Sequence, residues 1–374
     1  MPSRRSSFVR TAIVHYWLVN MRGGEKVVES LCRLFPAADI FTLFYDPSAV
    51  SPLIRSRNVR ASFLQPLRRH YRSLLPLMPM ALESLDLRGY DLVISSESGP
   101  AKGVIVPSGA RHICYCHTPM RYLWDLYPAY RSDWIGSKLR RAAFTPIANY
   151  LRLWDFASAA RVDEFVANSN NVRRRIEKTY RRAAEVIYPP VDVDRFYWKP
   201  AEDYFLIVSE LVAYKRIDAA IAAFSRNGRR LKIAGDGPEY QRLRKGAPDN
   251  IEFCGRVSDA DLQELYARCR AFLMPGEEDF GITAVEALAS GKPVVALAKG
   301  GVLETAPMEN PVGGALYDES SGQDLQSGLD HFERIEHLVQ PALLRAHAAR
   351  FREEIFLKKF RSLLWTPNAA TQAI

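Results

Sequence analysis

Short apolar stretches alternate with segments of helical periodicity along the first half of the chain. Thr11–His15 has the pattern of a strand, and residues 25–35 follow with apolar side chains every three or four positions, which is typical of an amphipathic helix. The same pattern predicts further strands at Ile40–Phe44, Leu92–Ser95, Gly103–Val106, His112–Cys116 and Glu164–Ala167. Because strands that alternate with helices form parallel sheets, this half is expected to be an α/β domain.

A second alternating series follows the dipeptide Pro189–Pro190, whose rings restrict the backbone and mark a domain boundary. Its strands are expected at Tyr204–Val208, Leu231–Ala234, Ile251–Phe253, Ala271–Met274 and Pro293–Leu297. With 374 residues the chain is long enough for two domains of ordinary size. The expected fold is therefore α/β, with two doubly wound Rossmann-like domains at residues 1–188 and 189–348.

The composition, with 48% hydrophobic and 25% charged residues, is that of a soluble globular protein. No run of eighteen apolar residues exists, so we expect no membrane span. Residues Met1–Arg5 lead into the first strand without the apolar core of a signal peptide. Five scattered cysteines lack the spacing of a zinc site and are expected to be reduced thiols of a cytoplasmic protein.

Basic residues are concentrated in the first half. Residues 1–190 contain 28 Lys and Arg against 15 Asp and Glu, whereas residues 191–374 contain 23 against 27. A basic half could face an anionic membrane, a phosphorylated substrate or nucleic acid, or be no more than a soluble surface. The segment Leu64–Met78 adds large apolar residues to its cations, which suits a membrane interface. An ordinary amphipathic connection, interrupted by Pro66 and Pro76, fits it equally.

Two carboxylates, separated by seven residues, stand out in the second series. Glu278 is expected in the loop after the strand Ala271–Met274, and Glu286 on the short helix that Gly291 closes. The carboxyl end of a parallel strand is where open α/β sheets bind ligands. Carboxylates there would accept hydrogen bonds from a hydroxyl-rich ligand such as a sugar. Taken alone, Glu286 would more often be a solvated helix residue.

This segment resembles the Glu-x7-Glu signature of retaining family 4 glycosyltransferases, which have the two-domain GT-B fold. The resemblance implies that Glu278 contacts the transferred sugar and that Glu286 holds the ribose of the nucleotide. It also assigns the residues between them to the donor site, namely Asp279, Phe280, Gly281, Ile282 and Thr283. The fold implies a cleft between an acceptor-binding first domain and a nucleotide-sugar-binding second domain. A C-terminal helix within residues 349–374 is expected to pack back on the first domain.

The segment Ser209–Asp218 follows the first strand of the second domain and resembles the family's Arg-x4-Lys element, whose two cations clamp the donor diphosphate. Lys215 matches the Lys and is expected to be catalytic, with Ser209 assigned to donor binding. Glu210 stands where the family has Arg, and a carboxylate cannot pair with a diphosphate. Either Arg216 or a group of the first domain compensates, or donor binding is weaker.

Two glycine-containing turns are expected close to the donor. Gly235 and Gly237, with Pro238 near the start of the next helix, resemble the family's Gly-Asp-Gly-Pro loop beside the nucleotide. Gly23 and Gly24 precede a helix N-terminus, where free N–H groups and the helix dipole favour a phosphate, although such turns often use glycine for geometry alone. The resemblance places this second turn against the donor diphosphate or the acceptor. The full Gly-x-Gly-x-x-Gly fingerprint is absent, which argues against a dehydrogenase.

His117 follows the strand His112–Cys116, a position from which it could donate to a sugar hydroxyl or a phosphate oxygen. A lone His is more often structural. The family, however, has a His at the matching place near the donor sugar, so a catalytic role is expected. Arg121, Tyr122 and Trp124 come next and are candidates for acceptor binding, because aromatic faces pack on sugar rings and Arg binds phosphate.

Metal dependence is not expected. Asp192–Asp194 has the Asp-x-Asp spacing of metal-binding glycosyltransferases, but it follows the boundary prolines and has the character of a turn. No other carboxylate cluster calls for Mg²⁺. The resemblance therefore implies a metal-independent, retaining hexosyltransferase with no cofactor beyond its GDP- or UDP-linked sugar donor.

The first half looks like mannosyltransferases of bacterial O-antigen, lipopolysaccharide and exopolysaccharide assembly, through His117–Pro119 and, beyond it, Tyr214–Asp218. This likeness implies GDP-mannose as the donor and a lipid-linked saccharide as the acceptor. It further implies a cytoplasmic protein with peripheral contact to the inner face of the bacterial inner membrane. A sugar-nucleotide epimerase of the same fold and a sugar-nucleotide-binding protein without turnover remain alternatives. A nucleic-acid-binding protein is disfavoured, because its basic residues would be scattered and the carboxylate pair would have no role.

Overall fold

The computed structural model describes residues 9–131 and 138–365, so the expectations for Met1–Arg5 and for the chain from residue 366 onward lie outside the described residues. The chain divides into two compact units, Met1–Tyr188 with Lys359–Ile374, and Pro189–Lys358. Among the described residues, no helix combines the length and the apolar character needed to cross a bilayer.

The first unit contains a parallel sheet whose seven described strands run in the order β3-β2-β1-β4-β5-β6-β7. The strands are β1 (Thr11–His15), β2 (Asp39–Thr42), β3 (Val59–Ala61), β4 (Leu92–Glu97), β5 (Arg111–Cys116), β6 (Glu164–Ala167) and β7 (Ala184–Val186). The helices are α1 (Gly23–Leu34), α2 (Pro52–Arg55), η1 (Gln65–Leu77), α3 (Met78–Glu83), η2 (Ala101–Gly103), α4 (Tyr127–Ala129), α5 (Lys138–Ser158), η4 (Ala159–Arg161) and α6 (Asn170–Tyr180).

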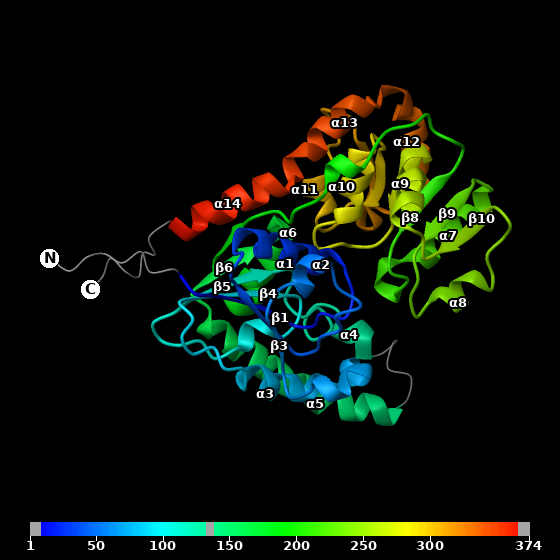
Figure 1. Ribbon diagram of the computed structural model, residues 1–374. Coiled ribbons are helices and arrows are strands. Elements are labelled where there is room, and N and C mark those ends of the chain that lie inside the picture. The colour runs from blue at the N-terminus through cyan, green and yellow to red at the C-terminus, as the bar shows by residue number, and fades with distance from the viewer. Residues whose placement is uncertain (1–8, 132–137, 366–374) are drawn as a thin grey trace. The chain divides into compact units, whose positions relative to one another are not determined.

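Helices cover both faces of this sheet. Figure 1 shows α1 and α2 on one side of the strands and α3 and α5 on the other. On the α3 side, Ala12 and Val14 of β1 pack in one cluster with Ala81 and Leu82 of α3. The central strands are therefore buried on both faces, as their continuous apolar runs require. The strand order reverses between β1 and β4, which defines the edge at which a doubly wound sheet binds ligands.

The second unit contains a parallel sheet of six described strands in the order β10-β9-β8-β11-β12-β13, with the reversal between β8 and β11. The strands are β8 (Phe205–Val208), β9 (Leu231–Ala234), β10 (Ile251–Gly255), β11 (Ala271–Met274), β12 (Val294–Leu297) and β13 (Gly314–Tyr317). The helices are η5 (Val193–Arg195), η6 (Ala213–Lys215), α7 (Ile217–Asn227), α8 (Tyr240–Arg244), α9 (Asp259–Arg268), α10 (Ile282–Ala289), α11 (Val302–Thr305), η7 (Glu319–Ser321), α12 (Leu325–Ile335), η8 (Glu336–Leu338), α13 (Pro341–Ala348), η9 (Ala349–Phe351) and α14 (Glu353–Trp365), whose last part from Lys359 belongs to the first unit.

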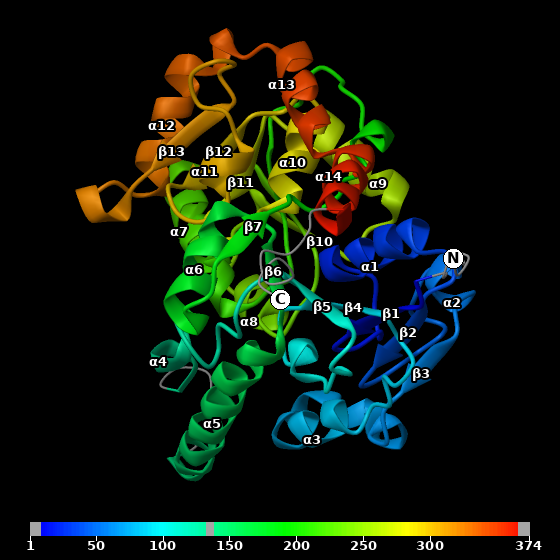
Figure 2. The same cartoon turned by 90° about the vertical axis from the view of Figure 1, so that its left-hand side faces the viewer.

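Aromatic contacts hold the helices of this unit against both faces of its sheet. Phe205 of β8 contacts Phe224 of α7 and Phe332 of α12 on one face. Phe272 of β11 contacts Tyr266 of α9 on the other. Figure 2 shows β11, β12 and β13 side by side in this sheet. The two sheets confirm the α/β class with two doubly wound, Rossmann-like domains.

The expected strands are confirmed to within two residues at each end, with one exception. Gly103–Val106, predicted as a strand, consists instead of the end of η2 followed by irregular backbone. Both sheet neighbours of β4 are already present as β1 and β5, and Gly103 instead packs against α5, where a Cβ would lie only 2.2 Å from the indole ring of Trp154. Three strands were not expected, β3, β7 and β13, and all of them are edge strands of three or four residues.

Local details at the helix ends also differ from expectation in part. Ser258 caps α9, since its hydroxyl accepts from the Asp261 N–H at 3.1 Å. Pro238, expected near the start of a helix, lies two residues before Tyr240, where α8 begins. The segment Leu64–Met78 is mostly the 3₁₀ helix η1, in which His70 has non-helical dihedral angles.

Candidate functional site

An ion pair marks the ligand-binding edge of the second sheet. Lys215 ends the turn η6 after β8, and Glu278 lies in the loop after β11, the parallel neighbour of β8. The Lys215 ammonium group donates to Oε1 of Glu278. Because the strand order reverses between these two strands, their carboxyl ends leave a crevice where the loops diverge. The structure therefore brings together two residues that the sequence singled out separately.

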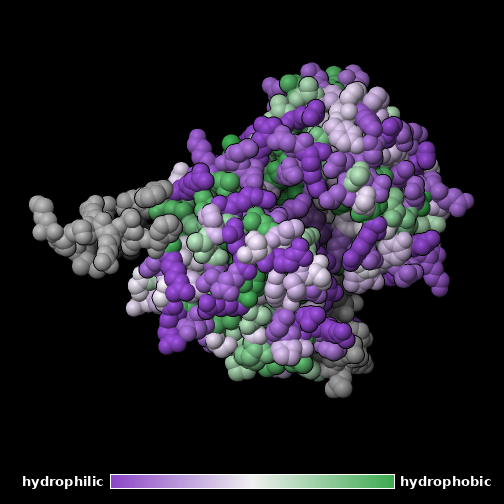
Figure 3. Space-filling model, viewed as in Figure 1, coloured by the Kyte–Doolittle hydropathy of each residue, from purple (hydrophilic) through white to green (hydrophobic). Residues whose placement is uncertain are grey.

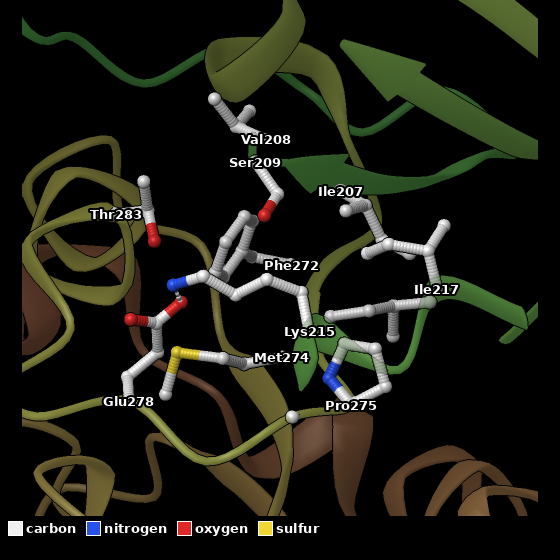
Figure 4. Close-up of a pocket in the computed structure, with 12 residues that line it drawn as sticks. Ile207, Val208, Ser209, Lys215, Ile217, Phe272, Met274, Pro275, Glu278 and Thr283 are labelled. Atoms are coloured by element: carbon white, nitrogen blue, oxygen red, sulfur yellow. Dashed lines mark hydrogen bonds and ion pairs between the residues drawn. The ribbon is translucent and has the colours of Figure 1, made fainter. Parts of the chain in front are cut away.

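The pair lines a pocket of the second unit, shown in Figure 4, where the Thr283 hydroxyl points toward it. Apart from Lys215 and Glu278, the lining residues are Ile207, Val208, Ser209, Ile217, Phe272, Leu273, Met274, Pro275, Gly276 and Thr283. Polar groups are thus few and converge on an otherwise apolar wall, as in small-molecule sites. Ser209 and Thr283, both predicted as donor-binding residues, supply the hydroxyls.

Lys215 is a cation in spite of its surroundings. Burial opposes its charged form, but the adjacent Glu278 carboxylate outweighs that effect and raises the pKa of Lys215 above its usual range. Only 14% of the Lys215 side chain and 22% of the Glu278 side chain is exposed. Both charges are therefore held in a partly desolvated place, where an anionic ligand would compete with Glu278 for the ammonium group.

Glycines bring the loops of this edge into backbone contact. A Cβ at Gly276 would lie 2.7 Å from the carbonyl oxygen of Tyr214, next to Lys215. On the other side, the N–H of Gly301 donates to the carbonyl oxygen of Glu278 at 2.8 Å, and a Cβ at Gly300 would lie 2.2 Å from the same oxygen. Larger residues at these positions would separate the loops and move the ion pair.

Glu286 lies on α10, one turn after Thr283, and is 5% exposed. Its Oε2 accepts from the hydroxyl of Tyr266 at 3.1 Å, and its Oε1 lies 3.4 Å from Nη2 of Arg195. These two contacts orient the carboxylate beside the pocket, although it does not line the pocket. Arg195 belongs to the turn after the boundary prolines, whereas Tyr266 carried no sequence signal.

The turn after β9 rests on the segment after β8. Gly235 has φ of +136°, and a Cβ there would lie 1.9 Å from the carbonyl oxygen of Ser209. A Cβ at Gly237 would lie 2.4 Å from the carbonyl oxygen of Leu211. Only glycine permits this approach, so Gly235 and Gly237 are brought to the same edge as Lys215. Phe280, Gly281 and Ile282 form the start of α10, where Gly281 has φ of +90°.

Arg216 is not among the residues that line the pocket. It adopts the left-handed conformation, with φ of +56°, at the N-cap position directly before α7. Its Nη1 lies 3.3 Å from Oε1 of Glu319. The backbone twist thus turns adjacent cations in different directions, Lys215 to Glu278 and Arg216 to Glu319.

In the first unit, polar side chains gather at the carboxyl ends of β1, β4 and β5. Nε2 of His117 lies 2.9 Å from Oγ of Ser96, and Nδ1 of His15 donates to the Ser96 carbonyl oxygen at 2.9 Å. A Cβ at Gly24 would lie 3.6 Å from Nε2 of His117, so the start of α1, at Gly23, approaches this group closely. Burial, helped by His15, lowers the pKa of His117 to about 3, and the imidazole is neutral at physiological pH.

The segment after β5 carries the three predicted acceptor residues. Nε of Arg121 donates to Asp125 at 3.1 Å, and Tyr122 is half-buried with its ring 5.9 Å from that of Tyr130. The indole N–H of Trp124 donates to the fully buried carboxylate of Asp155 at 2.8 Å. Asp155 gave no sequence signal, because a single carboxylate in a long helix is ordinarily exposed.

The Asp192–Asp194 motif forms the turn η5, as expected, and Asp194 is paired with Arg352 at 2.6 Å. Within the described ranges, no group of three His, Cys, Asp or Glu side chains has the arrangement of a metal site.

Two family models match consecutive parts of the chain. The model for Glycosyltransferase Family 4 matches residues 21–195, and the model for Glycosyl transferases group 1 matches residues 194–349. The second match contains the whole Lys215–Glu278 pocket.

Individual relatives cover the chain in part. An uncharacterized glycosyltransferase of Methanocaldococcus jannaschii is 28% identical over 53% of this chain and 55% of that protein. A GDP-mannose-dependent alpha-(1-6)-phosphatidylinositol monomannoside mannosyltransferase of Mycobacterium tuberculosis is 32% identical over 37% of this chain and 44% of that enzyme. The chain thus spans about half the length of these curated relatives.

Among solved structures, Anabaena HepE in complex with UDP-glucose superposes with a TM-score of 0.66 at 16% identity, over 95% of this chain and 99% of HepE. At this identity the likeness shows the fold. Together with the two family matches, which run from residue 21 to residue 349, it supports a glycosyltransferase of the GT-B class.

Proposed function

We propose that this protein is a retaining, metal-independent glycosyltransferase that moves a sugar from a nucleotide-sugar donor to a saccharide acceptor. The observation that carries the proposal is the Lys215–Glu278 ion pair, which lies at the strand reversal inside the segment matching glycosyl transferases group 1. A cation and a carboxylate side by side suit a ligand that is a diphosphate at one end and a sugar at the other.

Each part of the donor has a partner in the second unit. Lys215 binds the diphosphate, and Glu278, released from Lys215, accepts hydrogen bonds from hydroxyls of the sugar. Glu286 accepts from the ribose, with its orientation set by Tyr266. Gly235 and Gly237 let the turn after β9 pack against the backbone after β8, which brings this turn to the edge where the nucleotide would bind.

In the reaction, the bond between the anomeric carbon and a diphosphate oxygen breaks while a bond to an acceptor hydroxyl oxygen forms on the same face. The acceptor proton passes to the departing diphosphate. Lys215 stabilises the charge that develops on that diphosphate, and the N-terminal amides of α10 add their dipole. His117, neutral at physiological pH, would contribute a hydrogen bond rather than a charge.

The donor we propose is GDP-mannose. The support is the mycobacterial relative, whose name states dependence on GDP-mannose, whereas HepE, similar in fold, binds UDP-glucose. The acceptor we propose is a lipid-linked saccharide, bound with the help of Arg121, Tyr122 and Trp124.

A surface of the first unit supports peripheral contact with an anionic membrane. Leu75 of η1 packs with Ala148 and Leu151 of α5, so η1, α3 and α5 adjoin. Six large hydrophobic side chains of these elements are exposed, Leu67, Leu77, Met80, Tyr150, Leu153 and Phe156, and so is Phe63 just before η1. Figure 3 shows hydrophobic residues along the lower margin, where Figure 1 places α3 and α5. We call this the η1–α5 surface.

The charge of the η1–α5 surface is mainly positive. Neither Ser62–Leu82 nor Arg141–Trp154 contains an Asp or a Glu, while the two segments together contain Arg68, Arg69, Arg72, Arg141 and Arg152. Glu83, at the end of α3, is paired with Arg161. Cations beside exposed apolar side chains suit a bilayer with anionic headgroups. Such contact would bring the enzyme to a lipid-linked acceptor.

The test incubates the protein with EDTA, a polyprenyl-diphosphate saccharide and, in parallel, GDP-mannose, UDP-glucose and UDP-N-acetylglucosamine. We expect a mannosylated product that keeps the anomeric configuration of the donor, and no product from the Lys215→Met variant. An inverted product, or loss of activity with EDTA, would contradict the mechanism. Transfer from a UDP-sugar alone would change only the donor. A converted nucleotide sugar without acceptor would indicate an epimerase, and binding without turnover an inactive binding protein.

A further inference from the structure

A cluster of buried charges lies beneath the segment that follows β5. Lys102, Glu97 and Asp155 are all fully buried, and they come from η2, β4 and α5. The Lys102 ammonium group donates to Asp155 and lies 3.7 Å from Oε1 of Glu97. The hydroxyl of Tyr180 on α6 also donates to Asp155, at 3.0 Å. We call these four residues the buried cluster.

The buried cluster holds both ends of a short segment. The backbone N–H of His117 donates to the carbonyl oxygen of Glu97 at 2.6 Å, and the indole N–H of Trp124 donates to Asp155 at 2.8 Å. Between these ends lie Arg121 and Tyr122. The conformation of residues 117–124 therefore depends on where the two buried carboxylate-bearing residues are placed.

Stability alone does not require such a cluster. A buried ion pair is often no more stabilising than apolar side chains of the same volume, because desolvation offsets the attraction. The charged groups instead fix the orientation of their neighbours. The Asp155 carboxylate can accept from Lys102, Tyr180 and Trp124 only when all three donors point inward. Lys102 places a positive charge next to that carboxylate, and both side chains are shielded from solvent.

We propose that Asp155 is a positioning residue, which acts through the Trp124 indole to hold residues 117–124 in the conformation that binds the acceptor. The inference rests on the proposed function, since it takes this segment as the acceptor site. Trp124 then helps acceptor binding by fixing the segment through its indole N–H, which donates to Asp155 in the interior.

The experiment compares Trp124→Phe with a matched control, Trp154→Phe. Both changes remove an indole N–H that donates to a carboxylate, since Trp154 donates to Glu83 at 2.9 Å. Trp154 lies beside Asp155 on α5 but has no bond to residues 117–124. Amide hydrogen exchange of residues 117–126 is measured on the full-length protein without any ligand, and steady-state kinetics use GDP-mannose and a polyprenyl-diphosphate saccharide.

We expect Trp124→Phe to accelerate amide exchange in residues 117–126 by about tenfold to a hundredfold, the loss of one hydrogen bond to a charged group. The acceptor KM should rise by a similar factor while the donor KM stays within about twofold. Trp154→Phe should leave both quantities unchanged. Equal exchange rates in the two variants would overturn the positioning role, whatever the activity. Faster exchange with an unchanged acceptor KM would overturn the acceptor assignment, because the Trp124–Asp155 bond would then order the segment without any effect on acceptor binding.

Discussion

Lys215 and Glu278 neutralise each other across the reversal point of the second sheet, 63 positions apart in the chain. In the proposed function, a diphosphate and Glu278 compete for this one ammonium group. Binding of the donor would therefore free Glu278 for the hydroxyls of the sugar.

Glu278→Gln is accordingly expected to raise the affinity for GDP or UDP while it lowers turnover. Loss of the competing carboxylate should strengthen nucleoside diphosphate binding by about threefold to tenfold, since such a pair is worth about 1 kcal/mol. Calorimetric titration measures this change. The control is Glu277→Gln, which removes the same charge from the same loop at a residue that does not line the pocket. Weaker diphosphate binding in Glu278→Gln would contradict the competition.

Lys215→Met should have the opposite effect on the diphosphate. We expect nucleoside diphosphate affinity to fall by about 1.5–3 kcal/mol, the worth of a hydrogen bond to a charged group, with nucleoside affinity nearly unchanged. Titrations with GDP and guanosine separate the two contributions. Lys232→Met serves as the control, because Lys232 is a cation of the same unit that pairs with Glu252. Equal losses for GDP and guanosine would mean that the loop itself is disturbed.

Glu286→Gln should weaken GDP and guanosine binding equally, by about 1–3 kcal/mol, if its carboxylate holds the ribose. Glutamine keeps the volume and can still accept from Tyr266, so the unfolding temperature should change little. Tyr266→Phe tests the orienting bond and should cause a smaller loss of affinity. Unchanged affinity for both ligands in Glu286→Gln would mean that Glu286 has only a structural role, through its contacts with Tyr266 and Arg195.

Sequence patterns located much of this arrangement, for identifiable reasons. The central strands are continuous apolar runs, and the loops that follow them carry Glu278, Lys215 and His117, so both the strands and the polar residues at their carboxyl ends were predictable. Edge strands were missed because they are short and interrupted by polar residues, such as Arg60 in β3 and Glu185 in β7.

Side-chain partners were not predictable in the same way. Glu286 meets Arg195 from 91 positions away, and Lys102 meets Asp155 from 53, without any local pattern in the sequence. Arg216 follows Lys215 directly, yet the left-handed backbone at Arg216 sends its side chain to Glu319. Such pairings follow from strand order and backbone twist, which a local pattern does not contain.

Glu97→Gln should change how stability depends on pH. Burial, together with Asp155 and in spite of Lys102, raises the pKa of Glu97 to about 7. The folded protein then holds a proton that the unfolded chain releases near its ordinary pKa of about 4.3. Stability from this proton is present below that value and is lost as the pH rises through about 7. Glutamine cannot ionise, so the stability of the variant relative to the wild type should increase as the pH rises.

Differential scanning calorimetry at pH 5 and pH 8.5 measures the difference in unfolding free energy between Glu97→Gln and the wild type. Between these two pH values we expect this difference to change by on the order of 2–3 kcal/mol in favour of Glu97→Gln. Glu83→Gln is the control. Burial opposes ionisation of Glu83, but hydrogen bonds from Trp154 and Arg161 lower its pKa, so its titration lies below this pH window. A constant difference for Glu97→Gln would mean that Glu97 is already ionised at pH 5.

The η1–α5 surface should bind anionic bilayers in a salt-sensitive manner. We expect the protein to sediment with vesicles that contain phosphatidylglycerol at low salt and to be released as salt rises, because its arginines act on headgroups within a Debye length of about 10 Å at 0.1 M salt. Vesicles of phosphatidylcholine alone should retain little protein. Replacing Leu153 and Phe156 by Ser should reduce binding even at low salt, since both side chains are exposed and would enter the interface.

The matched control replaces Leu303 and Leu338, two exposed leucines of the second unit, by Ser. Both double variants remove a similar exposed apolar area, so a loss of nonspecific hydrophobic adsorption to vesicles would affect them equally. Arg68→Gln with Arg69→Gln should lower the salt concentration at which the protein is released, because fewer cations remain to hold the headgroups. Equal binding of the Leu153/Phe156 variant and the wild type at every salt concentration would leave η1 and α5 as ordinary parts of the first unit.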